Sequence, residues 1–310
     1  MDRRDWAAAV RLFASMSLVG AYVALVKPLT ALIPLFALAF LRFAIAAVPL
    51  LPWTARAAGE APLTRTESWQ LFLQSFFGNF LFSICMLWGV ALTSATAAGL
   101  VLGALPVVVA LLSVLLLRER LSARLLLAVL CAGAGIALAQ LGKNGAGGHS
   151  ASVASSASWL GDALVFAAVC CEALYVVIGK RLVATRTPMR VSAWINLWGL
   201  ALTAPLGLWQ LAHLDLTTIA PRYWVDLVFY SLAASVVAVA LWMSGLRRIP
   251  AGFAGVFTVA LPLSTTAVAV AVLGERLAWE HAFALAFALA AILLAAWPVS
   301  PRSATATHQT

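Results

Sequence analysis

A short pattern occurs twice in this chain at a fixed spacing. Its two copies are Ala98-Gly99, Ala104-Leu105-Pro106 and Glu119-Arg120-Leu121, and Ala254-Gly255, Ala260-Leu261-Pro262 and Glu275-Arg276-Leu277. Corresponding residues lie 156 positions apart, and each proline precedes its glutamate by 13 residues. A match at several positions with one offset indicates an internal repeat, so we expect the chain to fold as two related halves.

The composition indicates an integral membrane protein. Of the 310 residues, 64% are hydrophobic and only 10% are charged, whereas a soluble domain carries about 25% charged residues. The net charge of +9 would suit nucleic acid. However, the basic residues lie in short connectors between apolar runs, so we expect a lipid bilayer as the partner and no nucleic acid.

Ten apolar runs are long enough to cross a membrane, because ~20 residues of helix span ~30 Å of hydrocarbon. They lack the alternation of barrel strands, which predicts an all-α protein. The ten expected transmembrane helices are roughly 7–26, 32–52, 69–90, 95–117, 123–141, 159–179, 191–211, 224–245, 251–273 and 281–297.

The Gly/Ser-rich segment 142–158 divides the chain into a five-helix repeat, 1–141, and a second repeat, 159–298, followed by a polar tail, 299–310. An odd number of spans ends on the side opposite to its start. The second repeat must therefore be inverted, and inverted repeats surround a central cavity in many transporters. Fifteen Lys and Arg residues lie on one side of the spans and four on the other. This asymmetry predicts cytoplasmic N- and C-termini in a bacterial cytoplasmic (inner) membrane.

Several short motifs resemble the drug/metabolite transporter superfamily, in particular its EamA family. They are Leu41-Arg42-Phe43, Pro106 in an Ala/Gly-rich span, Arg118-Glu119-Arg120-Leu121-Ser122, Gly161-Asp162, Leu241-Trp242 with Ile249-Pro250-Ala251, and Gly274-Glu275-Arg276-Leu277. The chain departs from the family at Arg118, where glycine is usual. The resemblance implies a secondary transporter that exports small metabolites, and the YddG-type exporters of aromatic amino acids are one subtype within it.

Two ionisable residues are expected at membrane depth. Glu172 could couple transport to protons or bind a substrate amine, or it could pair with a basic residue such as Arg42. Arg42 could bind a substrate carboxylate or bridge two helices.

Polar and aromatic residues on several spans are candidates for the substrate pathway, with packing between helices as the alternative. Asn79 and Ser83 share a helix face with Ser75 because they are spaced four residues apart. With Arg42 and Glu172, the candidate cavity residues are Tyr22, Asn79, Ser83, Trp88, Tyr175, Ser235, Trp242 and Thr258.

The repeated motifs predict structural roles. Pro106 and Pro262 leave carbonyl groups without a helical partner, so we expect hinges beside the pathway, or kinks that only shape packing. Gly99, Gly103 and Gly255 favour close helix packing. The pairs Glu119-Arg120 and Glu275-Arg276 are expected to tie down turns, with a gate latch as the alternative.

The leading functional hypothesis is a transporter of amino acids or related metabolites that works by alternating access, acting as a monomer or weak homodimer. There is no phosphate-binding loop for ATP, and we expect no cofactor and no metal. Exporters of other metabolites or drugs are the closest alternative. A channel, a lipid scramblase or an intramembrane enzyme would belong to other classes, and the enzyme is disfavoured because no catalytic constellation lies at membrane depth.

Overall fold

The computed structural model describes residues 3–55, 60–93, 101–120, 122–145, 156–261, 263–264, 267–268 and 279–296. All secondary structure in these ranges is helical. Gly99, Pro262, Glu275 and Arg276 lie outside the described residues.

The first half contains α1 (Arg3–Leu32), α2 (Leu35–Thr54), α3 (Arg65–Ser75), the π-helix η1 (Phe76–Leu81), α4 (Phe82–Leu92), α6 (Leu105–Leu117) and α7 (Ala123–Gly145). The second half contains α8 (Ser156–Thr185), α9 (Pro188–Ala212), the 3-10 helix η2 (Leu216–Thr218), α10 (Pro221–Leu232), the π-helix η3 (Ala233–Val237), α11 (Ala238–Leu246), α12 (Ala251–Val256), the 3-10 helix η4 (Phe257–Val259) and α14 (Trp279–Ala296).

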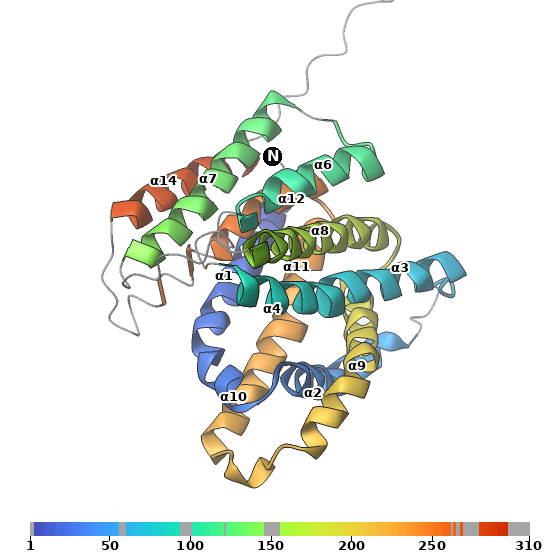
Figure 1. Ribbon diagram of the computed structural model, residues 1–310. Helices are drawn as coiled ribbons and strands as arrows, with labels where there is room; N and C mark the ends of the chain where they lie inside the picture. The colour runs from blue at the N-terminus through green and yellow to red at the C-terminus, as the bar shows by residue number, and fades with distance from the viewer. Residues whose placement is uncertain are drawn as a thin grey trace, which may run out of the picture.

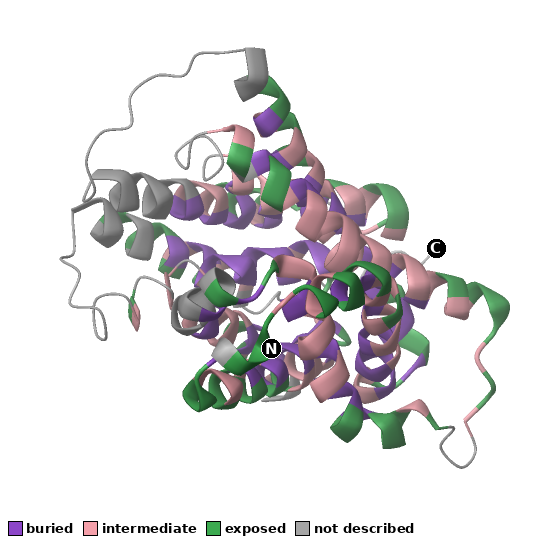
Figure 2. Ribbon diagram, turned by 60° about the horizontal axis from the view of Figure 1, so that its bottom comes forward, coloured by how far each residue is buried: buried purple, intermediate pink, exposed green. Residues whose placement is uncertain are grey.

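Five of these helical stretches are long and apolar enough to cross a membrane by length and composition. They are Leu35–Thr54, Arg65–Gly89, Trp159–Thr185, Pro188–Ala212 and Pro221–Leu246. Buried residues lie where helices meet, and exposed residues lie on the outer faces (Figure 2). Many outer side chains are large and apolar, among them Leu115, Trp209 and Val225, as expected for a surface in contact with lipid.

The two halves are related by a pseudo-two-fold arrangement. Corresponding helices pack against each other as α2 with α9, α6 with α12 and α7 with α14, and the last pair lies side by side in Figure 1. Two further large contacts form a matched pair, α4 with α8 and α11 with α1. A Cβ on Gly89 would lie 2.8 Å from Val165, and one on Gly245 would lie 2.6 Å from Leu12. The same close approach thus occurs twice, once between α4 and α8 and once between α11 and α1.

These contacts define two groups of helices, each containing helices of both halves. The first group contains α3, α4, α6 and α8, and α9 packs on α3. The second group contains α1, α10, α11 and α12 with η4, and α2 packs on α10. Each half therefore contributes to both groups, as the inverted repeat requires.

Ends that the sequence assigns to the same side of the membrane meet in the structure. Thr93, after the third span, donates a 2.5 Å hydrogen bond to Asp162 at the start of the sixth. Arg124, at the start of α7, donates to the carbonyl oxygens of Leu294 and Ala295 at the end of α14. Which side faces the cytoplasm stays a prediction from the basic residues.

The sequence led us to expect a hinge or kink at Pro106 within a continuous helix. In the structure no continuous helix passes through this residue. The fourth span is interrupted by a turn at Gly103 and Ala104, and Pro106 lies in the first turn of α6. Proline is well placed there because its missing N–H would have no helical partner. The ninth span has a comparable interruption at η4, just before the position of Pro262.

The unusual Arg118 has a structural explanation. Its φ of 56° and ψ of 31° are left-handed, and it is the only non-glycine residue with positive φ in the described chain. Glycine adopts this conformation without steric cost, and it is the residue that the resemblance described above implies at this position. The left-handed residue reverses the chain after α6 and starts the turn that contains Glu119.

Candidate functional site

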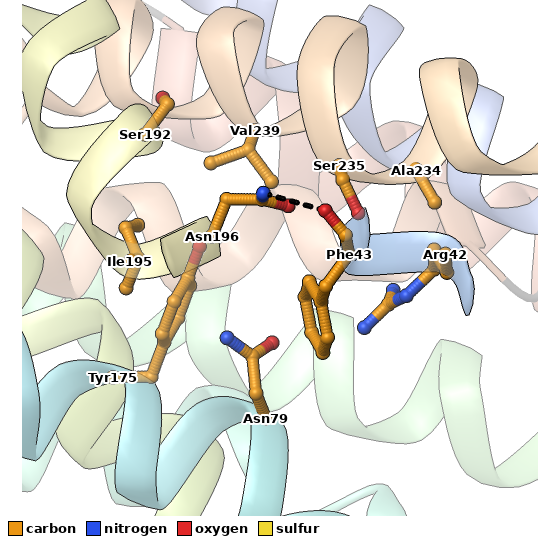
Figure 3. A pocket seen from close by; sticks show the side chains of 10 residues that line it. All are labelled: Arg42, Phe43, Asn79, Tyr175, Ser192, Ile195, Asn196, Ala234, Ser235 and Val239. Atoms are coloured by element: carbon orange, nitrogen blue, oxygen red, sulfur yellow. Dashed lines mark hydrogen bonds between the residues drawn. The ribbon is translucent and has the colours of Figure 1, made fainter. Parts of the chain in front are cut away.

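A small polar pocket lies between the two groups of helices, beside both π-helices (Figure 3). Its cavity volume is about 30 Å³. Ten residues from five spans line it: Arg42, Phe43, Asn79, Tyr175, Ser192, Ile195, Asn196, Ala234, Ser235 and Val239.

The two π-helices occupy equivalent positions in the repeat and bring matching residues to the pocket. Asn79 belongs to η1 and Ser235 to η3, and they are 156 positions apart, the offset of the repeated motif. A π-helix inserts a residue into the helical ladder, and such bulges are frequent at functional sites. The third span of each half thus presents a polar residue to the pocket from a bulge.

A tyrosine of one half packs against each bulge of the other. A Cβ on Gly78 in η1 would lie 2.3 Å from the Tyr175 ring, so only glycine fits there. Tyr22 packs against Ala233 and Ala234 of η3. Tyr22 and Tyr175 are 153 positions apart, as are Trp6 and Trp159, and Lys27 and Lys180. The first and sixth spans therefore carry a second set of repeat matches, which our sequence analysis did not detect.

Arg42 has a buried nitrogen without a partner in the described chain. Its guanidinium lies over the rings of Phe43 and Tyr230, 4.2 and 5.7 Å from their centroids. The Nε atom is buried and makes no hydrogen bond with any described residue. A buried donor of this kind costs about 1–3 kcal/mol when unsatisfied, which favours a bound acceptor at this point.

Two further buried pocket atoms lack partners among the described residues. Asn196 donates through Nδ2 to the carbonyl oxygen of Phe43 at 3.0 Å, while its Oδ1 accepts nothing. The Ser235 hydroxyl is likewise without a partner. The pocket therefore offers a cation, an amide oxygen and a hydroxyl.

Glu172 lies one helical turn before Tyr175 on α8 and is half-buried. Tyr22 and Tyr175 are both within electrostatic range of Glu172 and of Arg42. No ion pair joins Arg42 to Glu172, although the sequence left that pairing open, and the ion pairs in the described chain involve other residues. The two opposite charges are thus close to the site without neutralising each other by direct contact.

Six of the ten candidate cavity residues, Glu172 among them, do not line this pocket. The Ser83 hydroxyl donates to the carbonyl oxygen of Asn79, and the Thr258 hydroxyl donates to that of Gly255. Trp242 is buried in the apolar core, and Trp88 is 60% exposed. Tyr22 does not line the pocket either. Its side chain packs against η3.

The small residues lie at close helix contacts. A Cβ on Gly255 would lie 2.8 Å from Val109 of α6. Gly103 is approached by Gly133 of α7, where a Cβ would lie 2.9 Å from the Gly103 oxygen. The missing side chain of Gly255 therefore leaves space for a neighbouring helix, whereas at Gly103 it is the backbone oxygen that Gly133 approaches.

The Glu119 turn makes contacts that cross between the halves. The Glu119 carboxylate accepts hydrogen bonds from the Ala251 and Gly252 amides at 2.8 and 3.0 Å, while Arg120 is exposed. The Ser122 hydroxyl accepts from the Leu125 amide at 3.1 Å and so caps α7. The turn is tied to α12 of the other half as well as to its own.

A buried cluster of charges joins two loops on the side of the spans that also holds the Glu119 turn. Arg186 donates to both Glu67 carboxylate oxygens, at 2.8 and 2.6 Å, and to the Ala61 and Pro62 carbonyl oxygens. Hydrogen bonding to Glu67 raises the pKa of Arg186. Arg190 pairs with Glu60. These contacts fix the connection between the second and third spans.

Sequence reasoning missed Ser192 and Asn196 on α9. Ser192 and Asn196 are four residues apart, and Thr203 continues the same polar face of the helix. The same spacing identified Asn79 and Ser83 as candidates. Asn196 also lies 154 positions after Arg42, which makes it the counterpart of Arg42 in the repeat.

Inverted helical repeats around a polar pocket define a multi-pass membrane transporter fold. The chain belongs to the EamA-like transporter family, which matches residues 6–141 and 159–297. The chain is 32% identical to an uncharacterized transporter of Bacillus subtilis (strain 168), YetK, over 293 residues, covering 94% of this chain and 87% of YetK.

A second Bacillus subtilis transporter, YyaM, also uncharacterized, is 24% identical over 195 residues, covering 63% of this chain and 62% of YyaM. A solved crystal structure shares the fold with a TM-score of 0.75 and 21% identity, and the match covers 93% of this chain and 97% of that one. The relatives are named transporters, and this chain is a membrane transporter rather than an enzyme.

Proposed function

We propose that this protein exports amino acids or closely related small metabolites, with aromatic and hydrophobic side chains favoured. The transport is secondary and works by alternating access in a bacterial cytoplasmic membrane, with both termini in the cytoplasm. One observation carries the proposal: the guanidinium of Arg42 has a buried Nε without a partner beside a polar pocket.

The charges at the site suit a zwitterion. Arg42 can donate hydrogen bonds to a substrate carboxylate, since guanidinium and carboxylate match in geometry and charge. Glu172 can accept from the substrate amine, because it is not ion-paired with Arg42. An amino acid between them would satisfy both charges, whereas each charge alone is costly at membrane depth.

The walls of the pocket favour a small substrate with an apolar side chain. Its cavity volume of about 30 Å³ lies far below the range of about 300–1,000 Å³ found for ligand sites, so in this proposal the pocket widens to admit the substrate. The rings of Phe43 and Tyr175 line it, with the Tyr175 hydroxyl directed toward Asn196 (Figure 3). An aromatic side chain could stack on these rings.

Glu172 is also our candidate for proton coupling. A carboxylate without an ion-pair partner can exchange a proton as the site alternates between the two aqueous sides. In this proposal protonation and amine binding compete at the same oxygen atoms, so that entry of a proton releases the substrate.

Uptake into proteoliposomes tests the proposal. The purified protein is reconstituted and a panel of radiolabelled amino acids is offered with and without a pH gradient. We expect saturable uptake and counterflow of aromatic and hydrophobic amino acids, and loss of the pH response in Glu172→Gln. Non-saturable flux without counterflow would indicate a channel, and unchanged pH dependence in Glu172→Gln would exclude Glu172 as the proton site.

A further inference from the structure

Two side chains of opposite charge, Glu119 from the first half and Lys180 from the second, bind one turn of the second half. The turn comprises residues 246–252, between α11 and α12, and we name it the 246–252 turn. Lys180 of α8 donates from Nζ to the carbonyl oxygens of Leu246 at 2.7 Å and Ile249 at 2.8 Å. Glu119 accepts from the Ala251 and Gly252 amides at 2.8 and 3.0 Å.

The charges are arranged to match the ends of the two helices. The carbonyl group of Leu246, the last residue of α11, carries partial negative charge and meets the ammonium group of Lys180, whereas the first amides of α12 carry partial positive charge and meet the Glu119 carboxylate. Lys180 and Glu119 are also within electrostatic range of each other. Because Lys180 also donates to the Arg247 carbonyl oxygen at 3.4 Å, one pair of residues binds five backbone groups of a single turn.

The pair crosses between the two groups of helices. Lys180 and Glu119 belong to α8 and to the turn after α6, which pack together in the first group, while the 246–252 turn belongs to the second group. The pair lies on the side of the spans to which the sequence assigns fifteen of the Lys and Arg residues. Its contacts therefore hold the two groups together on that side.

We infer that Lys180 and Glu119 form the gate clamp on this side, and that the clamp must release the 246–252 turn before the pocket opens there. The inference rests on the alternating-access transport proposed above. Close packing supports it: a Cβ on Gly252 would lie 3.0 Å from both Leu125 and Ser113. The turn is thus held tightly in this structure, and a movement of the second group would break these hydrogen bonds together.

The sequence repeat adds a related observation. Lys180 matches Lys27 at an offset of 153, and Glu119 matches Glu275 at an offset of 156. The chain therefore carries the same two residue types at equivalent positions of the inverted half.

The test measures access to the pocket and needs no substrate. The four cysteines, Cys85, Cys131, Cys170 and Cys171, are replaced by alanine, and Ser235→Cys is introduced as a reporter in the pocket. Vesicles of the full-length protein are treated with a membrane-impermeant maleimide from each side in turn. Loss of transport alone would not alter this readout, so failure of the clamp and failure of the proposed transport are distinguishable.

The variants are Lys180→Met and Glu119→Gln. We expect labelling from the Lys180 side to become at least about tenfold faster in each, because Glu119→Gln loses one charge-assisted hydrogen bond and Lys180→Met loses at least two, with no such rise from the opposite side. The matched control is Arg181→Met, because Arg181 is the next residue on α8 and donates to the Leu116 carbonyl oxygen within the same group. Unchanged labelling in both variants, or an equal rise in Arg181→Met, would overturn the inference.

A second variant keeps the test decisive if the first two fold poorly. Lys180→Cys with Ile249→Cys in the same background allows a short cleavable cross-linker to join α8 to the 246–252 turn. We expect cross-linking to stop labelling of a pocket cysteine from that side and a reductant to restore it. Continued labelling while the cross-link is intact would show that the turn need not separate from α8.

Discussion

The ring of Tyr175 lies against Gly78 so closely that a Cβ at residue 78 would be 2.3 Å from the Cδ2 atom of the ring. Tyr175 lines the pocket, and Gly78 belongs to the π-helix that also positions Asn79. The geometry of the bulge and the position of the ring therefore depend on each other.

Gly78→Ala should displace the Tyr175 ring from the pocket. Overpacking of this kind costs about 1–3 kcal/mol, so we expect a lower melting temperature and a larger loss of transport. The double variant Gly78→Ala, Tyr175→Leu should recover the stability but not the transport. Normal uptake by Gly78→Ala would show that the position of the ring is unimportant.

Arg42→Met should weaken substrate binding. If Arg42 binds the substrate carboxylate, the variant loses a charge-assisted hydrogen bond worth about 1.5–3 kcal/mol, which raises KM about 10- to 100-fold. The control is Arg120→Gln, since Arg120 is exposed and should leave KM unchanged. An unchanged KM in Arg42→Met would assign Arg42 a purely structural role.

Arg186→Lys should destabilise the protein. Lysine cannot reproduce the bidentate contact with Glu67 and the bonds to two carbonyl oxygens. Arg186 is only 6% exposed, and we expect a loss of about 2–3 kcal/mol from the broken charge-assisted bonds. Thermal unfolding in detergent measures it, and Arg181→Lys, at an exposed position, should change far less. Equal melting temperatures for the two variants would contradict the assigned role of Arg186.

Arg118→Gly should stabilise the protein. Arg118 has a left-handed backbone, which costs a non-glycine residue about 1 kcal/mol. Glycine keeps the turn without that cost, although it gains freedom in the unfolded chain, so we expect a gain of about 0.5 kcal/mol. Arg120→Gly is the control, since Arg120 lacks positive φ. A fall in melting temperature for Arg118→Gly would show that the side chain contributes to the fold.

Much of the fold could be predicted from the sequence. The length of an apolar run and the match between the two repeats are each carried by many residues, so both can be recognised without a structure. The two inverted halves follow from the motifs around Pro106 and Pro262 and from the odd number of spans. The π-helices could not be predicted, because a single inserted residue in a helical ladder leaves no periodic signal in an apolar span. The break before Pro106 was missed for a related reason: proline marks a disturbed helix but does not say whether the helix bends or restarts.

The site was predictable only in part. Arg42, Asn79, Tyr175 and Ser235 line the pocket, and each is a polar or aromatic residue in an apolar span. Asn196 has the same signal and was overlooked, while Trp88 and Trp242 carry the signal but do not line the pocket. Which face of a span meets the pocket is set by packing between distant helices, and one sequence does not contain that information.

The most direct test of our account is a competition binding experiment with radiolabelled phenylalanine on the purified protein. The competitors are phenylalanine, 3-phenylpropionate, which lacks the amine, and 2-phenylethylamine, which lacks the carboxylate. Our account predicts that only the zwitterion competes strongly, because Arg42 and Glu172 bind its two charges separately. Equal competition by either single-charge analogue would contradict it.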